Sequence, residues 1–474
     1  MPLILGTNSI KDTGYNVANS LRFNSGSADS LQITPSSAGS LLKWTFSTWV
    51  KRSKLSGGQQ LLSAGPRSGG TVEDQLYILD GGEINWYDGT SATHVRRSSN
   101  LFRDPSAWYH FVFVWDTANG TANNRARIYV NGSEITYGTQ TTISQNANSK
   151  INGTGQHRIG AIGTVSGEEF NGYICETVFV NNQALAPTDF GEFDSDTPNV
   201  WKPKNVSGLT FGTNGFYLDF EDSSALGNDA AGSNNFTVNN LTAVDQSIDT
   251  CTNNFATMNP LDNFYSGNTF SEGNTKIVTP TSSSTFNTAT FGLSSGKWYW
   301  EVNYSAKSNT NAAMIGISEV PTVSASVILG YSSNYKNVGY LGSNGNTYIT
   351  GNGGSSYGNT YDVGDIIGVY LDLDNNKLYF SKNGTLQNSG TGVSITAPAS
   401  TGTGVYFPAL GDGGTPTTTS LTFLVNFGSP AYAISSSNTD DNGYGNFEYS
   451  PNITGDGAAK KFYTINTKNL AEFG

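Results

Sequence analysis

The chain of 474 residues is longer than one ordinary hydrophobic core, which predicts two domains. Aromatic residues make up 12%, charged residues 13%, and glycine numbers 56, a composition that excludes a disordered chain and favours short strands joined by tight turns. The net charge of −12 and the lack of a basic cluster argue against nucleic acid and anionic membranes as partners. The densest basic group, Lys51, Arg52 and Lys54, is expected to be a solvated strand end.

The amino terminus and the cysteines bear on the compartment of the protein. The apolar run at 3–5 is too short for a signal-peptide core, and no stretch approaches the roughly 18 apolar residues of a membrane span. We therefore expect neither export through a signal peptide nor membrane insertion. Cys175 and Cys251 are too few for a disulfide framework, so we expect two free thiols, with Cys175 buried in a strand.

Strand patterns dominate the first part of the chain, and helical periodicity is almost absent. In the segment 44–50, Trp44, Phe46 and Thr48 share one face of a predicted strand. Further elements are predicted at 108–115, which is apolar almost throughout, at 127–132, which runs into an Asn-Gly turn, at 170–180, and at 184–190, a short helical turn.

The segment 196–262 differs from its neighbours. It is rich in asparagine and has weak periodicity, apart from the apolar run at 216–220. We interpret it as an ordered but irregular connector that adds at most one strand to a neighbouring sheet.

Strand patterns return after the connector. Trp298, Trp300 and Phe407 lie in such segments, so we expect them in the core of a second domain. The predicted strands are 296–302, 314–318, 364–374, 377–381, 406–411 and 425–428, with a turn at 375–376.

Two hairpins of similar sequence lie about one domain length apart. Residues 127–132 read Arg-Ile-Tyr-Val-Asn-Gly, and residues 377–384 read Lys-Leu-Tyr-Phe-Ser-Lys-Asn-Gly. This favours two copies of one architecture over a short-period repeat array. Two unrelated hairpins with similar turns are the alternative.

The order of these motifs carries two family resemblances. Residues from 21 to about 193 resemble the laminin G-like branch of the concanavalin A-like lectin fold, through 21–23, 46–50, 108–111, 127–132 and 170–174. The second half resembles SPRY domains, through 296–302, the hairpin 364–384, 407–409 and 425–428. The resemblances imply an all-β protein with two concanavalin A-like jelly-roll β-sandwich domains. The expected divisions are an arm at 1–20, a laminin G-like domain at 21–195, a connector at 196–262, a SPRY domain at 263–430 and an extension at 431–474.

This pairing of modules is similar to that in bacteriophage virion proteins. The segments 253–261 and 464–470 match the wider pattern. The resemblance implies a protein on the virion surface, assembled in the host cytoplasm, with other virion proteins among its partners. Because phage fibres are commonly trimers, we expect a homotrimer.

No catalytic constellation emerges from the sequence. Asp372 and Asp374 share a strand face, but they enter a hairpin turn, where aspartate commonly bonds backbone amides. Glu192, Asp194 and Asp196 fall in a predicted loop, and His110 lies in an apolar strand and is expected in the core. We expect a non-enzymatic protein without an obligatory cofactor.

Calcium is the one metal that the resemblance suggests as a ligand. Related lectin-type sandwiches sometimes hold it at strand ends, where Asp80, Asp88 and Asp116 are predicted. No spacing resembles an EF-hand loop.

Aromatic residues in polar segments are the remaining candidates for a binding site. We expect a face in the loops 330–361, whose Tyr, Asn and Gly content resembles that of antibody paratopes, and a smaller set in the first domain. The alternative is that these tyrosines fill strands. The candidates are Tyr331, Tyr335, Tyr340, Tyr357, Tyr361, Trp86 and Tyr87.

Three functions follow from these features. The first is a tail fibre, spike or head appendage that binds a host cell-surface glycan or protein. The second is a structural protein that decorates or cements the virion through protein contacts alone. The third, a glycan hydrolase, lacks the required carboxylates.

Overall fold

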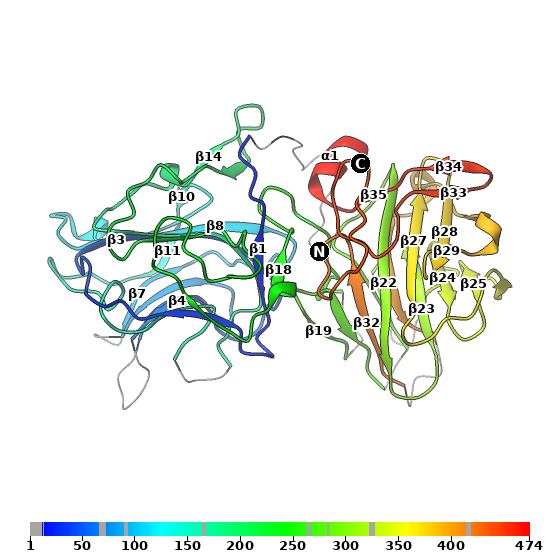
Figure 1. The fold of residues 1–474 in the computed structure, drawn as a ribbon, viewed down its shortest axis with the longest axis horizontal. Coiled ribbons are helices and arrows are strands. Elements are labelled where there is room, and N and C mark those ends of the chain that lie inside the picture. Colours follow the sequence, from blue (N-terminus) through cyan, green and yellow to red (C-terminus); the bar gives the residue numbers. More distant parts are fainter. Residues whose placement is uncertain are drawn as a thin grey trace. The chain divides into compact units, whose positions relative to one another are not determined.

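The computed structural model describes residues 12, 14–65, 73–89, 93–163, 167–262, 267–281, 284–321, 328–413 and 419–474. Strand makes up 40% and helix 5%, which confirms the all-β prediction. The chain forms two compact units that divide after Thr252 (Figure 1). We call them the first sandwich and the second sandwich. Of the predicted arm at 1–20, residues 1–11 and 13 lie outside the described residues.

The first sheet of the first sandwich is centred on two long strands, β3 and β13, which pair antiparallel. Its strand order is β10-β9-β8-β3-β13-β1-β18, and β16 shares the edge of β13 with β1. The strands are β10 (Ser133–Glu134), β9 (Ala126–Val130), β8 (Trp108–Asp116), β3 (Lys43–Arg52), β13 (Gly172–Asn181), β1 (Ser20–Phe23), β18 (Gln246–Ser247) and β16 (Phe216–Leu218).

The second sheet of this sandwich faces the first across the core. Its order is β11-β7-β6-β5-β4-β12-β2-β17. The strands are β11 (Tyr137–Gln140), β7 (Thr93–Ser98), β6 (Ile84–Asp88), β5 (Asp74–Ile78), β4 (Gln59–Ala64), β12 (His157–Ile159), β2 (Ser30–Ile33) and β17 (Thr237–Asn239).

Alternation along the strands builds the core between the two sheets. Trp44 and Phe46 of β3 point inward, as predicted, and Trp44 packs on Trp86 of β6 with ring centroids 5.1 Å apart. The intervening side chains of β3 lie on the outer face of the sheet. Burial of this cluster supplies most of the driving force for folding of the sandwich.

The outer face of the first sheet is also covered. Val112 and Val114 of β8 and Val178 of β13 pack against Phe190 and other side chains from the segment that follows β13. This explains why β8 is apolar on both faces. The covering segment includes a 3-10 turn at Pro187–Asp189, as predicted, and the hairpin of β14 (Gly191–Phe193) and β15 (Trp201–Pro203).

The segment 196–262 differs from the irregular connector that we expected. Its residues up to Thr252 belong to the first sandwich and contribute β16, β17 and β18, which pair with β13, β2 and β1. Each strand has three residues or fewer, too short for an alternating pattern to reveal it. Sequence periodicity therefore underestimated how far this segment is built into both sheets.

The basic group at the end of β3 is buried, contrary to the expectation of a solvated end. Lys51 is 1% and Arg52 0% exposed. Lys51 Nζ lies 2.7 Å from Asp249 Oδ2, and the guanidinium of Arg52 donates to the carbonyl of Phe102 at 2.5 Å. The acidic partner of Lys51 is almost two hundred residues away along the chain, so local sequence gave no sign of it.

The second sandwich also has two sheets. One has the order β19-β20-β32-β22-β27-β28-β29, with β30 on β28 and β35 on β22, and the other has the order β21-β31-β23-β24-β25-β26. The first comprises β19 (Thr269–Ser271), β20 (Lys276–Val278), β32 (Leu421–Asn426), β22 (Lys297–Lys307), β27 (Ile366–Asp372), β28 (Lys377–Lys382), β29 (Thr385–Leu386), β30 (Val393–Ser394) and β35 (Tyr463–Thr464). The second comprises β21 (Phe286–Thr288), β31 (Phe407–Asp412), β23 (Ala313–Ser318), β24 (Asn337–Leu341), β25 (Asn346–Ile349) and β26 (Ser355–Ser356).

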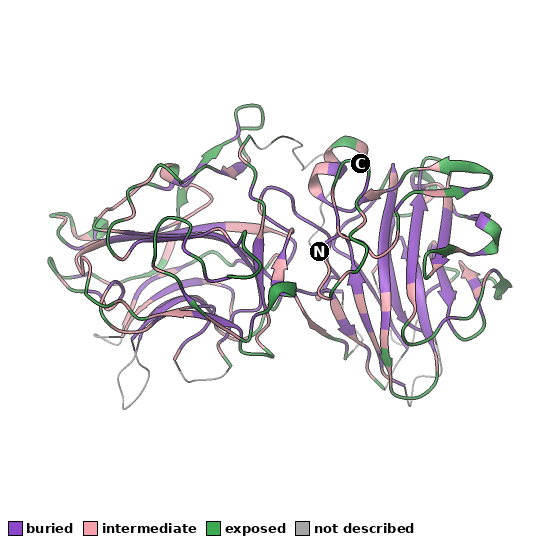
Figure 2. Cartoon of the chain, viewed as in Figure 1, coloured by how far each residue is buried: buried purple, intermediate pink, exposed green. Residues whose placement is uncertain are grey.

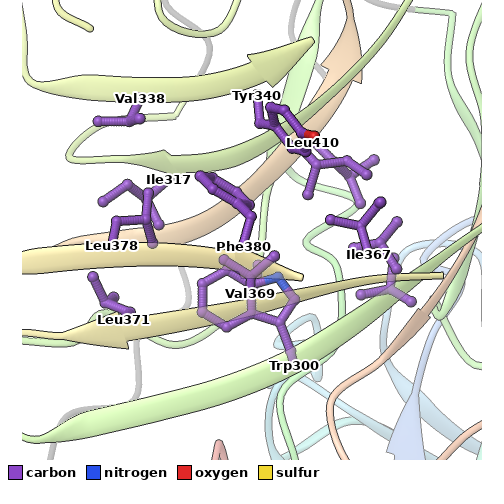
Figure 3. Packing of buried hydrophobic residues seen from close by; sticks show 14 of the residues in the cluster. Trp300, Ile317, Val338, Tyr340, Ile367, Val369, Leu371, Leu378, Phe380 and Leu410 are labelled. Carbon is purple, nitrogen blue, oxygen red and sulfur yellow. The ribbon is translucent and has the colours of Figure 1, made fainter. Parts of the chain in front are cut away.

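The core of the second sandwich lies between these sheets. Trp300 packs there with Val369 from the adjacent strand β27 and with Phe380 from β28, the strand beyond it (Figure 3). Trp298 and Trp300 are at most 1% exposed and Phe407 is 4% exposed, which confirms their predicted burial. Exposed residues gather in the connecting loops (Figure 2).

The extension at 431–474 is part of the second sandwich. β35 pairs parallel with β22. The helix α1 (Thr467–Phe473) follows it, and the side chain of Asn466 caps the helix by accepting a hydrogen bond from the Asn469 amide. A hairpin of β33 (Ile453–Gly455) and β34 (Ala458–Lys460) precedes β35 in the chain. Among the described residues, no helix is long and apolar enough to cross a membrane.

Candidate functional site

The predicted tyrosine face is not a surface, which corrects the sequence interpretation. Tyr335, Tyr340, Tyr357 and Tyr361 are 8%, 0%, 7% and 1% exposed. Tyr340 and Tyr361 pack with ring centroids 5.0 Å apart, and the Tyr361 hydroxyl donates to the carbonyl of Ala313 at 2.9 Å. A buried tyrosine is stable where its hydroxyl finds such a partner. The polar residues between them had suggested loops, but the rings turn inward.

Tyr331 alone of the five is exposed, by 44%. Its ring stacks on that of Tyr348 in β25, with centroids 4.5 Å apart and planes 20° apart. The side-chain amide of Asn344 donates to the Tyr348 hydroxyl at 3.1 Å. We call Tyr331 and Tyr348 the tyrosine platform.

The two aromatic candidates of the first domain, Trp86 and Tyr87, also differ in burial. Trp86 is 1% exposed and packs in the core against Trp44 and Trp115, so it cannot meet a ligand. Tyr87, the next residue in β6, points the other way because side chains alternate along a strand. It is half-buried against His94, at 5.3 Å between ring centroids.

The three calcium candidates do not form one site. Asp80 accepts the Gly57 amide at 2.6 Å, and Asp116 lies 3.4 Å from the Lys43 ammonium. Asp88 ends β6. In the part of the chain that the structure describes, no three or more His, Cys, Asp or Glu side chains are grouped to hold a metal ion.

The carboxylates weighed for catalysis have structural partners. Asp372 is fully buried, accepts hydrogen bonds from Asn375 and lies 3.0 Å from the Lys460 ammonium. Asp374 lies 3.0 Å from the ammonium of Lys297. Of the carboxylates expected in a loop, Glu192 instead lies in the short strand β14, and Asp194 lies 3.1 Å from the Lys202 ammonium.

His110 is a buried structural residue, as predicted. Its ring stacks on Trp49 at 4.7 Å, and burial lowers its pKa to about 3. The indole N–H of Trp201 donates to His110 Nδ1 at 2.9 Å, so the proton of the neutral ring is on Nε2, which donates to Ser47 at 2.8 Å. Both nitrogens are occupied, so the imidazole is not placed to act as a base.

A depression lined mainly by polar and charged residues lies at one end of the second sandwich. It is a hollow of about 520 Å³ formed where β22, β24 and β28 end and β23 and β27 begin. We call it the end hollow. It is lined by Lys307, Asn309, Thr310, Asn311, Gly342, Ser343, Thr360, Tyr361, Asp362, Asp365 and Lys382.

Two ion pairs fix the loops of the end hollow. Lys307 Nζ lies 2.5 Å from Asp362, and Lys382 Nζ lies 3.0 Å from Asp365. The Lys307 ammonium lowers the pKa of Asp362. Burial alone would raise the pKa of Asp365. The Asp362 amide and the Lys382 ammonium both donate to its carboxylate, and the net effect is a lowered pKa. Both aspartates are therefore ionised at neutral pH, and the charges of the lining balance.

Hydrogen bonds to the backbone hold the lining residues in place. Asn311 donates from its side-chain amide to the carbonyl of Tyr361, and the Tyr361 amide donates to the carbonyl of Gly342 at 3.0 Å. The side chains of Asn309, Ser343 and Thr360 are exposed around this frame. Hydrogen bonds and ion pairs thus hold the lining of the hollow in place, while hydroxyl and amide groups around it are exposed to solvent.

Two family descriptions match separate parts of the chain. Residues 25–189 match the concanavalin A-like lectin/glucanases superfamily, and residues 297–423 match the SPRY domain. The chain joins a concanavalin A-like domain to a SPRY domain. The end hollow and the tyrosine platform both belong to the SPRY domain.

Individual relatives resemble short parts of the chain. Ran-binding protein 9 of Danio rerio is 32% identical over 89 residues, 19% of this chain and 14% of the relative, and the human protein is equally similar over 12% of its length. The chain therefore spans only a small part of these relatives. The SPRY domain of human HERC1 is 16% identical over 35% of this chain and 96% of that domain, with a TM-score of 0.29. A putative carbohydrate binding protein of Bacteroides ovatus is 18% identical over 48% of this chain and 59% of its own, with a TM-score of 0.33.

One turn of the SPRY domain connects its two surface features. Gly342 and Ser343, between β24 and β25, line the end hollow, and Asn344 in the same turn bonds the platform at Tyr348. We call the end hollow and the tyrosine platform together the loop end. A hollow rich in donors and acceptors, linked by this turn to an aromatic pair in which Tyr331 is exposed, is suited to hydrogen bonding and stacking with a polar ligand.

Sequence reasoning placed a candidate binding face at 330–361 in the second domain but missed the end hollow. Its lining comes from four separate places in the chain, none of which forms a motif alone. The available signal was the clustering of Lys, Asp and Asn at the ends of predicted strands, as in Asp362 and Asp365 before β27 and Lys382 at the end of β28.

Proposed function

We propose that this protein is a non-enzymatic component of a bacteriophage virion surface, a tail fibre, spike or head appendage, that binds a host cell-surface glycan or protein. The matches to a concanavalin A-like domain and a SPRY domain support a binding role, for protein or carbohydrate partners. The observation that carries the proposal is the loop end of the SPRY domain, where one turn links a polar hollow to the platform that carries exposed Tyr331.

The chemistry of the loop end favours a glycan. Sugars present hydroxyl groups that donate and accept hydrogen bonds, and C–H faces that stack on aromatic rings. Asn309, Ser343 and Thr360 supply the first kind of contact and Tyr331 the second. The lining charges are paired, so binding does not depend on a charged sugar.

The virion assignment rests on the sequence resemblance. Two segments carry it, 253–261 and 464–470, and in the fold they lie side by side. The Ala256 amide donates to the carbonyl of Ile465 at 3.0 Å, and the Thr467 amide donates to that of Asn254 at 2.9 Å. The two segments thus form one structural unit in this chain. Other virion proteins are the expected neighbours, and a homotrimer would add avidity to weak single contacts.

Binding to host glycans tests the proposal. We expect Tyr331→Ala and the double variant Asn309→Ala, Thr360→Ala each to weaken binding of the purified protein to host-surface polysaccharide by about tenfold or more, because each removes about one to two hydrogen bonds or a stacking ring. Binding is measured by titration on immobilised polysaccharide, with released reducing sugar assayed in parallel.

The controls are matched in exposure. Leu101→Ala, where Leu101 is 48% exposed in the first sandwich, matches Tyr331, and Thr139→Ala with Gln140→Ala on β11 matches the polar pair. Both controls should leave binding unchanged. Equal binding by all variants would remove the loop end from consideration. Release of reducing sugar would replace the proposal with hydrolysis, and the absence of any binding would favour the structural role in the virion.

A further inference from the structure

The only two cysteines of the chain meet in the first sandwich. Cys175 lies in β13 and Cys251 lies four residues beyond β18, and their sulfur atoms are 3.6 Å apart although 76 residues separate them. Neither thiol is bonded to another sulfur in the structure, which agrees with the sequence expectation of two free thiols. Their contact was not expected.

The contact is held from both sides. Cys175 is fixed opposite Trp49 in the pairing of β13 with β3. On the other side, Asp249 binds the buried Lys51 ammonium at 2.7 Å and the indole N–H of Trp108 at 3.2 Å. The Val17 amide donates to the Thr252 hydroxyl at 3.0 Å, so side chains two residues before and one residue after Cys251 anchor this segment.

We propose that Cys175 and Cys251 are a covalent modification site, at which exchange with a small-molecule disulfide forms an intrachain disulfide. The sulfurs must approach by about 1.5 Å to reach the bond length of a disulfide. Rotation about the two Cα–Cβ bonds is the smallest motion that brings them together, because the anchored backbone already aims both thiols at the same place.

The exchange has two steps. Cys251 is half-buried and Cys175 is fully buried, so the Cys251 thiolate attacks one sulfur of the small disulfide and releases the first small thiol. The Cys175 thiolate then attacks the Cys251 sulfur of the mixed disulfide and releases the second. Two electrons pass from the cysteine pair to the small disulfide, and the two thiol protons end on the two released thiols.

The surroundings make this reaction slow. Burial raises the pKa of both thiols, and the carboxylates of Glu176 and Asp249 act in the same direction on Cys175. The fraction of reactive thiolate at neutral pH is therefore small. Such a site suits a lasting bond formed once, after the chain leaves a reducing compartment, rather than a rapid redox cycle.

The bond would close the segment that covers the first sheet. Residues 176–250 lie between the two cysteines and include β16, β17 and β18 together with the covering layer around Phe190. A disulfide that closes so long a loop restricts the unfolded chain strongly. The modification would therefore fix the outer layer and the three late strand pairings in place.

Oxidation of the purified full chain under native conditions tests the proposal. After incubation with oxidised glutathione, we expect the intact mass to fall by two hydrogen atoms and a non-reducing digest to contain Cys175 and Cys251 in one linked peptide pair. The unfolding transition of the first sandwich should rise by about 5–10 °C and return on addition of dithiothreitol.

The variants Cys175→Ser and Cys251→Ser are the matched controls. The first sandwich of each variant should melt at the same temperature before and after glutathione treatment. A cooperative transition also shows that the variant is folded. Three results would overturn the proposal: unchanged mass with both thiols still titratable, glutathione retained on Cys251 without a link to Cys175, or a link between two chains.

Discussion

At the scale of single residues, burial decides what an aromatic or ionisable side chain does. Trp300 and Tyr331 lie about thirty positions apart in the SPRY domain, yet the first is 1% and the second 44% exposed. The first contributes to folding and the second is available to a ligand.

Trp300→Ala should therefore lower the free energy of unfolding of the second sandwich by about 3–5 kcal/mol, since a large cavity opens between its sheets. Urea unfolding followed by fluorescence measures the change. Leu101→Ala, at an exposed position, should alter stability by less than about 0.5 kcal/mol. A Trp300 variant as stable as the parent would mean that this core is assigned wrongly.

Glu176 predicts a pH dependence of the first sandwich. Burial raises its pKa from 4.5 to about 7, although Tyr217 and Tyr15 donate to its carboxylate. Because the folded pKa lies above the unfolded one, the folded state holds the proton more tightly. The contribution of Glu176 to the free energy of unfolding is therefore fully present below pH 4.5. It is lost as pH rises to about 7, and this loss amounts to about 3 kcal/mol.

The difference between parent and Glu176→Gln isolates this effect from other buried groups, such as His110, whose depressed pKa has the opposite slope. We expect the unfolding free energy of the parent relative to the variant to fall by about 3 kcal/mol between pH 4.5 and 7.5. Parallel pH profiles would show that Glu176 has an ordinary pKa.

At the scale of elements, the first sandwich depends on strands that arrive late in the chain. β16, β17 and β18 complete both sheets, and Phe190 and Trp201 belong to the layer over the outer face. Val112 and Val178 would face water without that layer.

A chain that ends at residue 195, the boundary expected from sequence, should therefore fail to fold, whereas residues 14–252 should fold. Exposure of the apolar outer face is the physical reason, and aggregation is its expected sign. Circular dichroism and thermal melts of the two fragments measure the difference. Cooperative unfolding of the shorter fragment would show that the covering layer is dispensable.

At the scale of the whole molecule, each unit has its own core of buried apolar residues. We expect calorimetry of the full chain to show two transitions, with Trp300→Ala lowering the temperature of one and Glu176→Gln changing the other with pH. A single transition that both variants shift together would mean that the sandwiches unfold as one unit.

The sequence by itself determined the fold class, the order of the two domains and the burial of Trp298, Trp300 and His110. These features are local, because alternation along a strand and a turn such as Asn-Gly are written in adjacent residues. The family resemblances rest on the same local patterns in a fixed order, which is why both domains were recognisable without a structure.

Only the tertiary structure decided which polar or aromatic residues are exposed and which meet. Tyr340 and Tyr361 can be buried because their hydroxyls reach backbone carbonyls, and Lys51 can be buried because its ammonium pairs with the Asp249 carboxylate. The end hollow and the contact of Cys175 with Cys251 likewise join distant segments. Such pairings depend on strand order and register, which bring together residues that have no relation along the chain.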